Sequence, residues 1–122
     1  MKNYEKYSNL NFLYQHVKSD PALIIELINI YLVQTPGLIE AMKKGLAESK
    51  WKLVQASAHK IVPSFKIFGV KNEYEVKARK VEELASLNES NYLIEVLINE
   101  LEIACNNIYT ELQQEMVLLQ QK

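Results

Sequence analysis

The chain has 122 residues, 48% of them hydrophobic, and its 14 Lys and Arg residues nearly balance its 15 Asp and Glu residues. This length and apolar content suit one domain, residues 1–122, with a single packed core. The formal net charge is −1 and no basic run occurs. Nucleic acid is therefore not an expected partner, because such binding needs clustered cations.

Cys105 is the only cysteine and lies among apolar positions, which predicts a buried and inert thiol. No apolar run approaches ~18 residues, and the opening Met-Lys-Asn-Tyr-Glu lacks a hydrophobic signal region. We therefore expect a soluble, cytoplasmic protein with no membrane partner.

The elements predicted in chain order are all helices, because glycine and proline are few and no alternating apolar pattern occurs. A short first helix is expected from Asn9 to Val17, after a cap formed by Ser8 or Asn9. His16 lies near its end, where a cation complements the helix dipole, and no further role is expected for it.

The second helix is expected to begin at Asp20-Pro21, a capping residue followed by proline at the first helical position. Thr35-Pro36 repeats this signature, so residues 35–48 form either a new helix or a kinked continuation of the same one. The positions expected to face inward are Leu23, Leu27, Ile30 and Tyr31.

The next helix is expected to run from a cap at Ser49 to about Phe68, with Gly69 ending it and Pro63 inside it. Asn72 and Glu75 have the spacing of a capping box, which predicts a further helix ending near Leu87-Asn88.

A long last helix is expected from about Asn91, with one apolar stripe along its whole length. The stripe comprises Leu93, Leu97, Leu101, Ala104, Ile108, Leu112, Met116 and Leu119. Four long helices with short connections predict an all-α fold, an antiparallel four-helix bundle with a short additional N-terminal helix.

The most informative residue is His59, on a predicted helix whose apolar side points the other way. At 100° per residue, the positions within about 60° of the opposite side form the expected core stripe: Leu53, Ser57, Ile61, Ser64, Phe65 and Phe68. The residues expected around His59 include no carboxylate and are Lys52, Gln55, Ala56, Val62, Pro63 and Lys66. This pattern predicts an exposed histidine on a surface that can accept phosphate.

The histidine segment resembles the histidine-containing phosphotransfer (HPt) domain family. The matching positions are Ala58, His59, Pro63, Ser64 and Gly69, with Ile61 in place of the family's leucine. The upstream region is similar too, at Asp20, Glu26-Leu27, Tyr31-Leu32 and Thr35-Pro36-Gly37-Leu38. The resemblance covers most of the chain.

The chain departs from the family at Val62, where a lysine that helps to hold the phosphoryl group is usual. Lys66 is the expected substitute, since it lies about 20° from the His59 direction and its side chain should lean back toward His59. Lys60 lies about 100° round the helix and is the weaker candidate.

The resemblance implies a phosphoprotein of a two-component phosphorelay. His59 would accept a phosphoryl group from a receiver-domain aspartate and pass it to another receiver. The implied partners are receiver domains of response regulators or of hybrid histidine kinases, which would dock on Gln55, Ala56, Val62, Pro63 and Gly69. The chain itself would be a monomer.

The implied reaction needs no cofactor on this chain, since the Mg²⁺ is expected on the partner receiver. Neither a Walker pattern nor a Gly-rich loop occurs, so intrinsic kinase activity is not expected. Two histidines without nearby cysteines also predict no metal site.

Two other functions fit the same residues. The first is a receiver-binding regulator that transfers poorly, because Val62 replaces the usual lysine. The second is a plain helical interaction module whose long last helix forms a dimer seam.

Overall fold

A computed structural model describes residues 6–18, 20–89 and 92–121, which form five helices and no strand. The helices are α1 (Asn11–His16), α2 (Pro21–Ala47), α3 (Trp51–Ile67), α4 (Asn72–Ala85) and α5 (Tyr92–Gln120). The prediction of an all-helical chain is confirmed. The expected start of the last helix near Asn91 lies outside the described residues.

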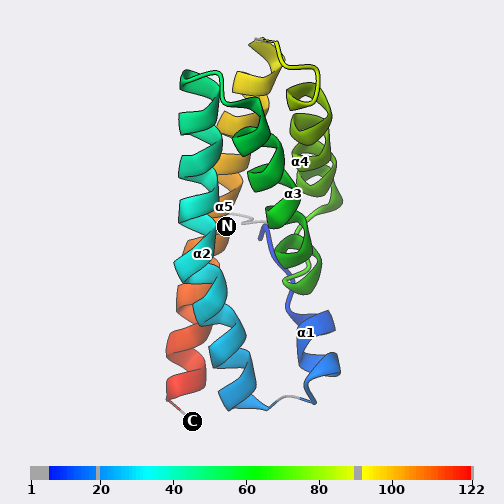
Figure 1. The fold of residues 1–122 in the computed structure, drawn as a ribbon. Helices are drawn as coiled ribbons and strands as arrows, with labels where there is room; N and C mark the ends of the chain where they lie inside the picture. The colour runs from blue at the N-terminus through cyan, green and yellow to red at the C-terminus, as the bar shows by residue number, and fades with distance from the viewer. Residues whose placement is uncertain (1–5, 19, 90–91, 122) are drawn as a thin grey trace, which may run out of the picture.

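The two long helices, α2 and α5, run side by side in opposite directions (Figure 1). α3 packs on α2, and α4 packs on both α3 and α5. The shorter α3 and α4 flank only the upper part of α2 and α5 in Figure 1, and α1 lies near their lower part. The hydroxyl of Tyr14 in α1 donates a hydrogen bond to Glu115 in α5, which holds α1 in place.

One apolar core lies between the helices, because each helix contributes one buried side. Its largest fully buried side chains are Tyr31, Phe65, Ile24, Ile28, Met42, Ile61, Ile94, Ile98, Leu101, Ile108 and Leu112, with Val54.

α2 begins as predicted. Asp20 Oδ1 accepts hydrogen bonds from the backbone N–H groups of Ala22 and Leu23, at 3.1 and 3.4 Å, and Pro21 is the first helical residue. The helix continues through Pro36 to Ala47, which decides between the two predicted arrangements in favour of one long helix.

Three predicted inward positions are wrong. Leu23 and Ile30 in α2 are 38% and 45% exposed, and Leu93 in α5 is 42% exposed. In α2 the buried side is rotated by about one residue, or about 100°, so that Ile24 and Ile28 enter the core instead.

Two predicted caps are also wrong. Ser49 has φ +54° and lies before the capping position of α3, which Lys50 occupies without a side-chain hydrogen bond. Asn72 is already the first residue of α4, so it makes no capping box with Glu75, and Lys71 stands at the N-cap. The side chains of Ser49 and Asn72 therefore do not lie where they could accept hydrogen bonds from the first N–H groups of α3 and α4.

The segment before α1 is held against α5 by a buried carboxylate. Glu111 accepts hydrogen bonds from the backbone N–H groups of Tyr7 and Ser8, at 2.8 and 3.0 Å, and from the Ser8 hydroxyl at 2.5 Å. The Ser8 hydroxyl is thus not a helix cap, whereas Asn9 Oδ1 accepts from the N–H of Asn11 at 2.9 Å. α1 therefore begins two residues later than expected.

By length and composition α2 could cross a membrane, although no uninterrupted apolar run in the sequence approaches ~18 residues. Its 27 residues include an 18-residue window of mean hydropathy 1.6, of which 28% is buried in this structure. Core helices of soluble proteins meet the same criterion of length and composition.

Candidate functional site

His59 projects outward from the middle of α3, and 71% of its side chain is exposed. The helix is anchored beneath it by Ser57, Ala58, Ile61 and Phe65, all of which are buried. The predicted exposure of His59 is therefore confirmed, and the imidazole is accessible to another molecule.

A carboxylate lies beside the imidazole, which the sequence did not lead us to expect. Glu82 of α4 places Oε2 at 3.0 Å from His59 Nδ1, and its side chain is 27% exposed. An ionised carboxylate only accepts hydrogen bonds, so this geometry requires Nδ1 to carry the proton. In the neutral imidazole with its proton on Nδ1, the lone pair of Nε2 is left free for reaction.

Figure 1 shows α3 and α4 side by side, which explains how residues 23 positions apart meet. Nothing in the helical pattern around His59 contains this information, because Glu82 belongs to a different helix. The only signal available was the presence of Glu82 next to the inward-facing Val81, Leu84 and Ala85 of the same helix.

An open depression of ≈ 450 Å³ surrounds the pair. It is lined by Lys52, Gln55, Ala56, His59, Lys60 and Glu82. Two lysines thus lie around the histidine, and both are exposed. Their ammonium groups supply positive potential at the place where an anionic group would meet Nε2.

Val62 is not part of this surface. It is 6% exposed and belongs to the core, so its expected position around His59 is wrong. α3 packs against both α2 and α4, so its buried arc is wider than a single stripe and includes Val62. The exposed residues of the predicted docking set that flank His59 are Ala56 and Pro63, with Gln55 half-buried.

Lys66 lies outside the depression. Its Nζ is 3.9 Å from Glu75 Oε2 of α4, and the same carboxylate oxygen accepts a hydrogen bond from Arg79 at 3.1 Å. The Lys66 side chain is 60% exposed, so this ion pair is weak and can open at low cost.

Gly69 ends α3 as predicted and has φ +59°, a conformation that glycine adopts without strain. A Cβ atom at this position would lie 2.1 Å from the backbone oxygen of Asn9, so no other residue fits. The N–H of Asn9 also donates to the carbonyl of Phe68 at 2.9 Å. Gly69 lines a different hollow from His59, and the structure explains it by backbone packing.

Pro63 is exposed and lies beside a second hollow of ≈ 180 Å³ between α2 and α3. The hollow is lined mainly by apolar side chains, among them Leu27, Ile30, Leu38 and Ile67. Lys60 lines both this hollow and the depression around His59, so the two form adjoining parts of one face.

Cys105 is 5% exposed, as predicted, and burial raises the pKa of its thiol to about 12. The hydroxyl of the buried Tyr31 lies near this thiol. Burial is the main cause that raises the pKa of the Tyr31 phenol, and the neighbouring Cys105 is the second cause. Both groups stay protonated near neutral pH, so neither serves as a nucleophile. Across the described residues, no three His, Cys, Asp or Glu side chains gather where they could hold a metal ion.

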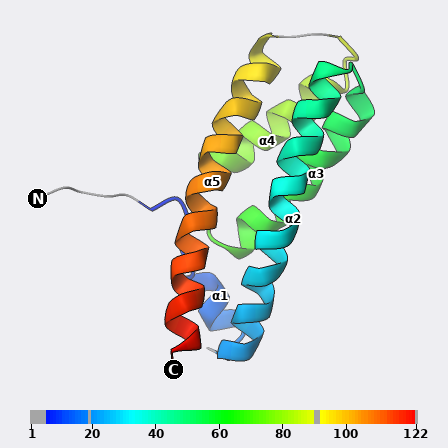
Figure 2. The same ribbon diagram turned by 90° about the vertical axis from the view of Figure 1, so that its left-hand side faces the viewer.

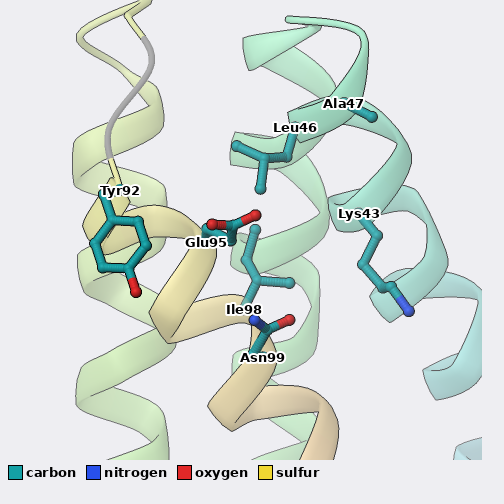
Figure 3. A pocket seen from close by; sticks show the side chains of 7 residues that line it. All are labelled: Lys43, Leu46, Ala47, Tyr92, Glu95, Ile98 and Asn99. Atoms are coloured by element: carbon teal, nitrogen blue, oxygen red, sulfur yellow. The ribbon is translucent and has the colours of Figure 1, made fainter.

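A further hollow of ≈ 520 Å³ lies where the end of α2 meets the start of α5 (Figure 3). Tyr92 and Glu95 line it from α5, and Leu46 lines it from α2. The Lys43 side chain points away from Glu95 in Figure 3, and its Nζ pairs with Glu102 at 2.9 Å. The Lys43 ammonium therefore does not point into this hollow. His59 is not among the residues that line it.

Comparison with protein-family models, with curated proteins and with solved structures finds no match to this chain. The resemblance to the HPt family therefore rests on the matching residues themselves.

Proposed function

We propose that this protein is a histidine phosphotransfer protein built as an antiparallel four-helix bundle with α1 as an additional helix. His59 accepts a phosphoryl group from the aspartyl phosphate of a receiver domain and passes it to another receiver. The observation that carries the proposal is the exposed imidazole with Nδ1 held by Glu82 at 3.0 Å, which leaves Nε2 as the nucleophile.

In the proposed step, the Nε2 lone pair forms an N–P bond while the bond from phosphorus to the aspartyl oxygen breaks. The receiver recovers its free carboxylate and supplies the Mg²⁺ that neutralises charge on the phosphoryl oxygens. The imidazole becomes positively charged as the N–P bond forms, and the Glu82 carboxylate stabilises that charge. The protein contributes position and charge, which dominate catalysis of phosphoryl transfer.

Lysines surround the proposed phosphoryl site on the α3 side. Lys52 and Lys60 line the depression, and Lys66 reaches it only when its contact with Glu75 opens. A dianionic phosphoryl group competes well for an exposed ammonium, so Lys66 remains our predicted stabiliser of phosphohistidine.

The proposed receiver-docking face extends from the depression across Pro63 to the apolar hollow between α2 and α3. Ile30 lines this hollow and is 45% exposed, and such apolar surface favours a protein partner. The small side chains of Ala56 and Pro63 allow the close approach that in-line transfer requires.

The test is transfer of ³²P from a panel of phosphorylated receiver domains. We expect label that is acid-labile and base-stable, and that is lost in His59→Gln. His16→Gln is the matched control, because His16 is also exposed but lies at the end of α1. Labelling that persists in His59→Gln would rule out the proposed acceptor.

The second candidate is a regulator that binds receivers without efficient transfer. Val62 favours it, because this aliphatic side chain, which is also buried, supplies no charge at the position where the family usually has lysine. Binding of receivers without any label on His59 would support this alternative, whereas neither binding nor labelling would leave a helical interaction module.

A further inference from the structure

The hollow where the end of α2 meets the start of α5 has no part in the proposed phosphotransfer, and it is here called the α2–α5 hollow. Figure 2 shows these two helix ends at the same end of the molecule. The volume of ≈ 520 Å³ lies within the range of about 300–1,000 Å³ that is typical of small-molecule sites. The described residues that line it are Lys43, Leu46, Ala47, Tyr92, Glu95, Ile98 and Asn99.

Glu95 supplies the one negative charge among these lining residues. In Figure 3 its carboxylate points from α5 toward α2, and it forms no ion pair with any residue that the structure describes. Lys43 does not compensate it, because the Lys43 Nζ lies 2.9 Å from Glu102. The hydrogen bond to Glu102 raises the pKa of Lys43, and Glu95 is not among the carboxylates that do so. The Glu95 charge is therefore open to a cation from outside the chain.

The backbone charges at this place oppose one another. α2 ends at Ala47 with a partial negative charge, and α5 begins at Tyr92 with a partial positive charge. Each is equivalent to about half a unit charge, so together they nearly cancel and the carboxylate sets the sign of the hollow. Glu95 lies in the first turn of α5, where a carboxylate also stabilises the helix. A test of Glu95 must therefore include a measure of folding.

Tyr92 adds an aromatic ring three residues before Glu95, on the same side of α5. The Tyr92 side chain is 78% exposed, and the face of such a ring attracts a cation within about 6 Å. The chain already holds one of its own cations in this way. Lys77 Nζ lies 5.0 Å from the centre of the Tyr74 ring and 3.4 Å from the Glu100 carboxylate. Tyr92 and Glu95 present the same two groups without a lysine between them.

From the open carboxylate and the exposed ring we propose that the α2–α5 hollow binds a small organic cation, an ammonium or guanidinium group carried on an apolar body. The cationic group lies between the Glu95 carboxylate and the Tyr92 ring. The apolar body contacts Leu46 and Ile98, which line the same hollow from α2 and α5. This site is independent of the proposed phosphotransfer, because His59 does not line it.

The first test is a titration of the nitrogen-15-labelled chain with 2-phenylethylammonium, followed by NMR. We expect saturable shifts of the amides in residues 43–47 and 92–99, with a dissociation constant on the order of 1 mM, which suits a ligand of about nine heavy atoms. 2-Phenylethanol has a similar shape without the charge and should bind at least ~10-fold more weakly, since it makes no charge-assisted contact. Equal binding of the alcohol, or no saturable shift of these amides, would overturn the proposal.

The second test compares variants in the same titration. Glu95→Gln should weaken binding about tenfold, and Tyr92→Ala about two- to fivefold, whereas Tyr92→Phe keeps the ring and should bind as the original chain does. Glu26→Gln is the matched control, because Glu26 is an exposed carboxylate of α2 that does not line the hollow.

The same spectra report whether each variant is folded. If Glu95→Gln loses its fold, the comparison of Tyr92→Ala with Tyr92→Phe still tests the site. Full affinity in a folded Glu95→Gln protein, equal affinities in the two Tyr92 variants, or an equal loss in Glu26→Gln would contradict the proposed cation site.

Discussion

Glu82 of α4 holds the Nδ1 atom of His59 from a neighbouring helix, at 3.0 Å. The contact joins a mostly exposed imidazole to a carboxylate whose side chain is 27% exposed, so the acid is more shielded from water than the base. The pair therefore fixes the orientation of the ring and the nitrogen that bears the proton, while Nε2 stays open to solvent.

Removal of the Glu82 carboxylate should impair transfer through the tautomer of His59. In Glu82→Ala the ring proton is free to occupy Nε2, where it blocks attack on phosphorus, and we expect the transfer rate to fall about tenfold. The transfer rate of Glu82→Gln should fall less, since the amide oxygen of glutamine can still accept a hydrogen bond from the Nδ1–H group of His59. Nitrogen-15 NMR of the His59 ring measures the tautomer directly, and rapid-quench labelling measures the rate.

Glu83→Ala is the control for this experiment, because Glu83 is adjacent and exposed but pairs with Lys80 at 3.2 Å. We expect it to leave both the tautomer and the rate unchanged. A Glu82→Ala protein that keeps the proton on Nδ1 and transfers at the original rate would show that the carboxylate does not position the ring.

Lys66 should influence the lifetime of phosphohistidine more than Lys60 does. Release of Lys66 from Glu75 costs little free energy, because the pair is exposed. An exposed charge pair between Lys66 and the phosphoryl group is worth ~0.5–1 kcal/mol, which corresponds to a two- to fivefold change in the phosphohistidine lifetime. We therefore expect Lys66→Ala to shorten the lifetime by about that factor. Glu75→Gln should lengthen it, because Lys66 then has no competing carboxylate at 3.9 Å.

The double variant Glu75→Gln with Lys66→Ala separates this effect from general electrostatics. The longer lifetime of Glu75→Gln should disappear in it, and salt should weaken each effect. Equal lifetimes in Lys66→Ala and Lys60→Ala would contradict the preference for Lys66. A shorter lifetime in Lys60→Ala would assign the role to Lys60, which lines the depression directly.

The sequence predicted those features that depend on one helix at a time. Asp20-Pro21 marked the start of α2, and Gly69 marked the end of α3, because capping residues and glycine act on the local backbone. The exposure of His59 followed from its angle on α3 relative to the apolar side, which needs no knowledge of the other helices.

The errors concern how the helices are turned toward one another. α2 is apolar over much of its circumference, so periodicity could not decide between the sides of Leu23 and Ile24. Val62 is buried because α3 has neighbours on two sides, and Glu82 reaches His59 because α4 packs beside it. Both results depend on helix packing, which the pattern of one helix does not contain.

Cys105 should make the protein less stable at high pH. Burial raises the pKa of the folded thiol from 9.0 to about 12, so in this range the unfolded chain releases a proton that the folded chain keeps. The thiol's contribution to stability is fully present below pH 9.0 and is lost as pH rises toward about 12.

Urea unfolding at about pH 8 and about pH 10 measures this effect. Between these pH values we expect the free energy of unfolding to fall by about 1 kcal/mol more in the original chain than in Cys105→Ala. Burial also raises the pKa values of Tyr14 and Tyr74 to about 12, so the variant keeps part of the alkaline loss. An identical loss in both proteins would mean that the thiol ionises freely in the folded state.

Two glycine-to-alanine substitutions should change stability in opposite directions. In Gly69→Ala the new Cβ would lie 2.1 Å from the Asn9 oxygen at φ +59°, and we expect a loss of about 2 kcal/mol or more. In Gly37→Ala the Cβ meets nothing within 4 Å inside α2, and better helix propensity should add about 0.5–1 kcal/mol. Urea unfolding of the two variants side by side measures both effects. If Gly69→Ala unfolds at the original urea concentration, the segment around Asn9 cannot pack against the end of α3 as it does here.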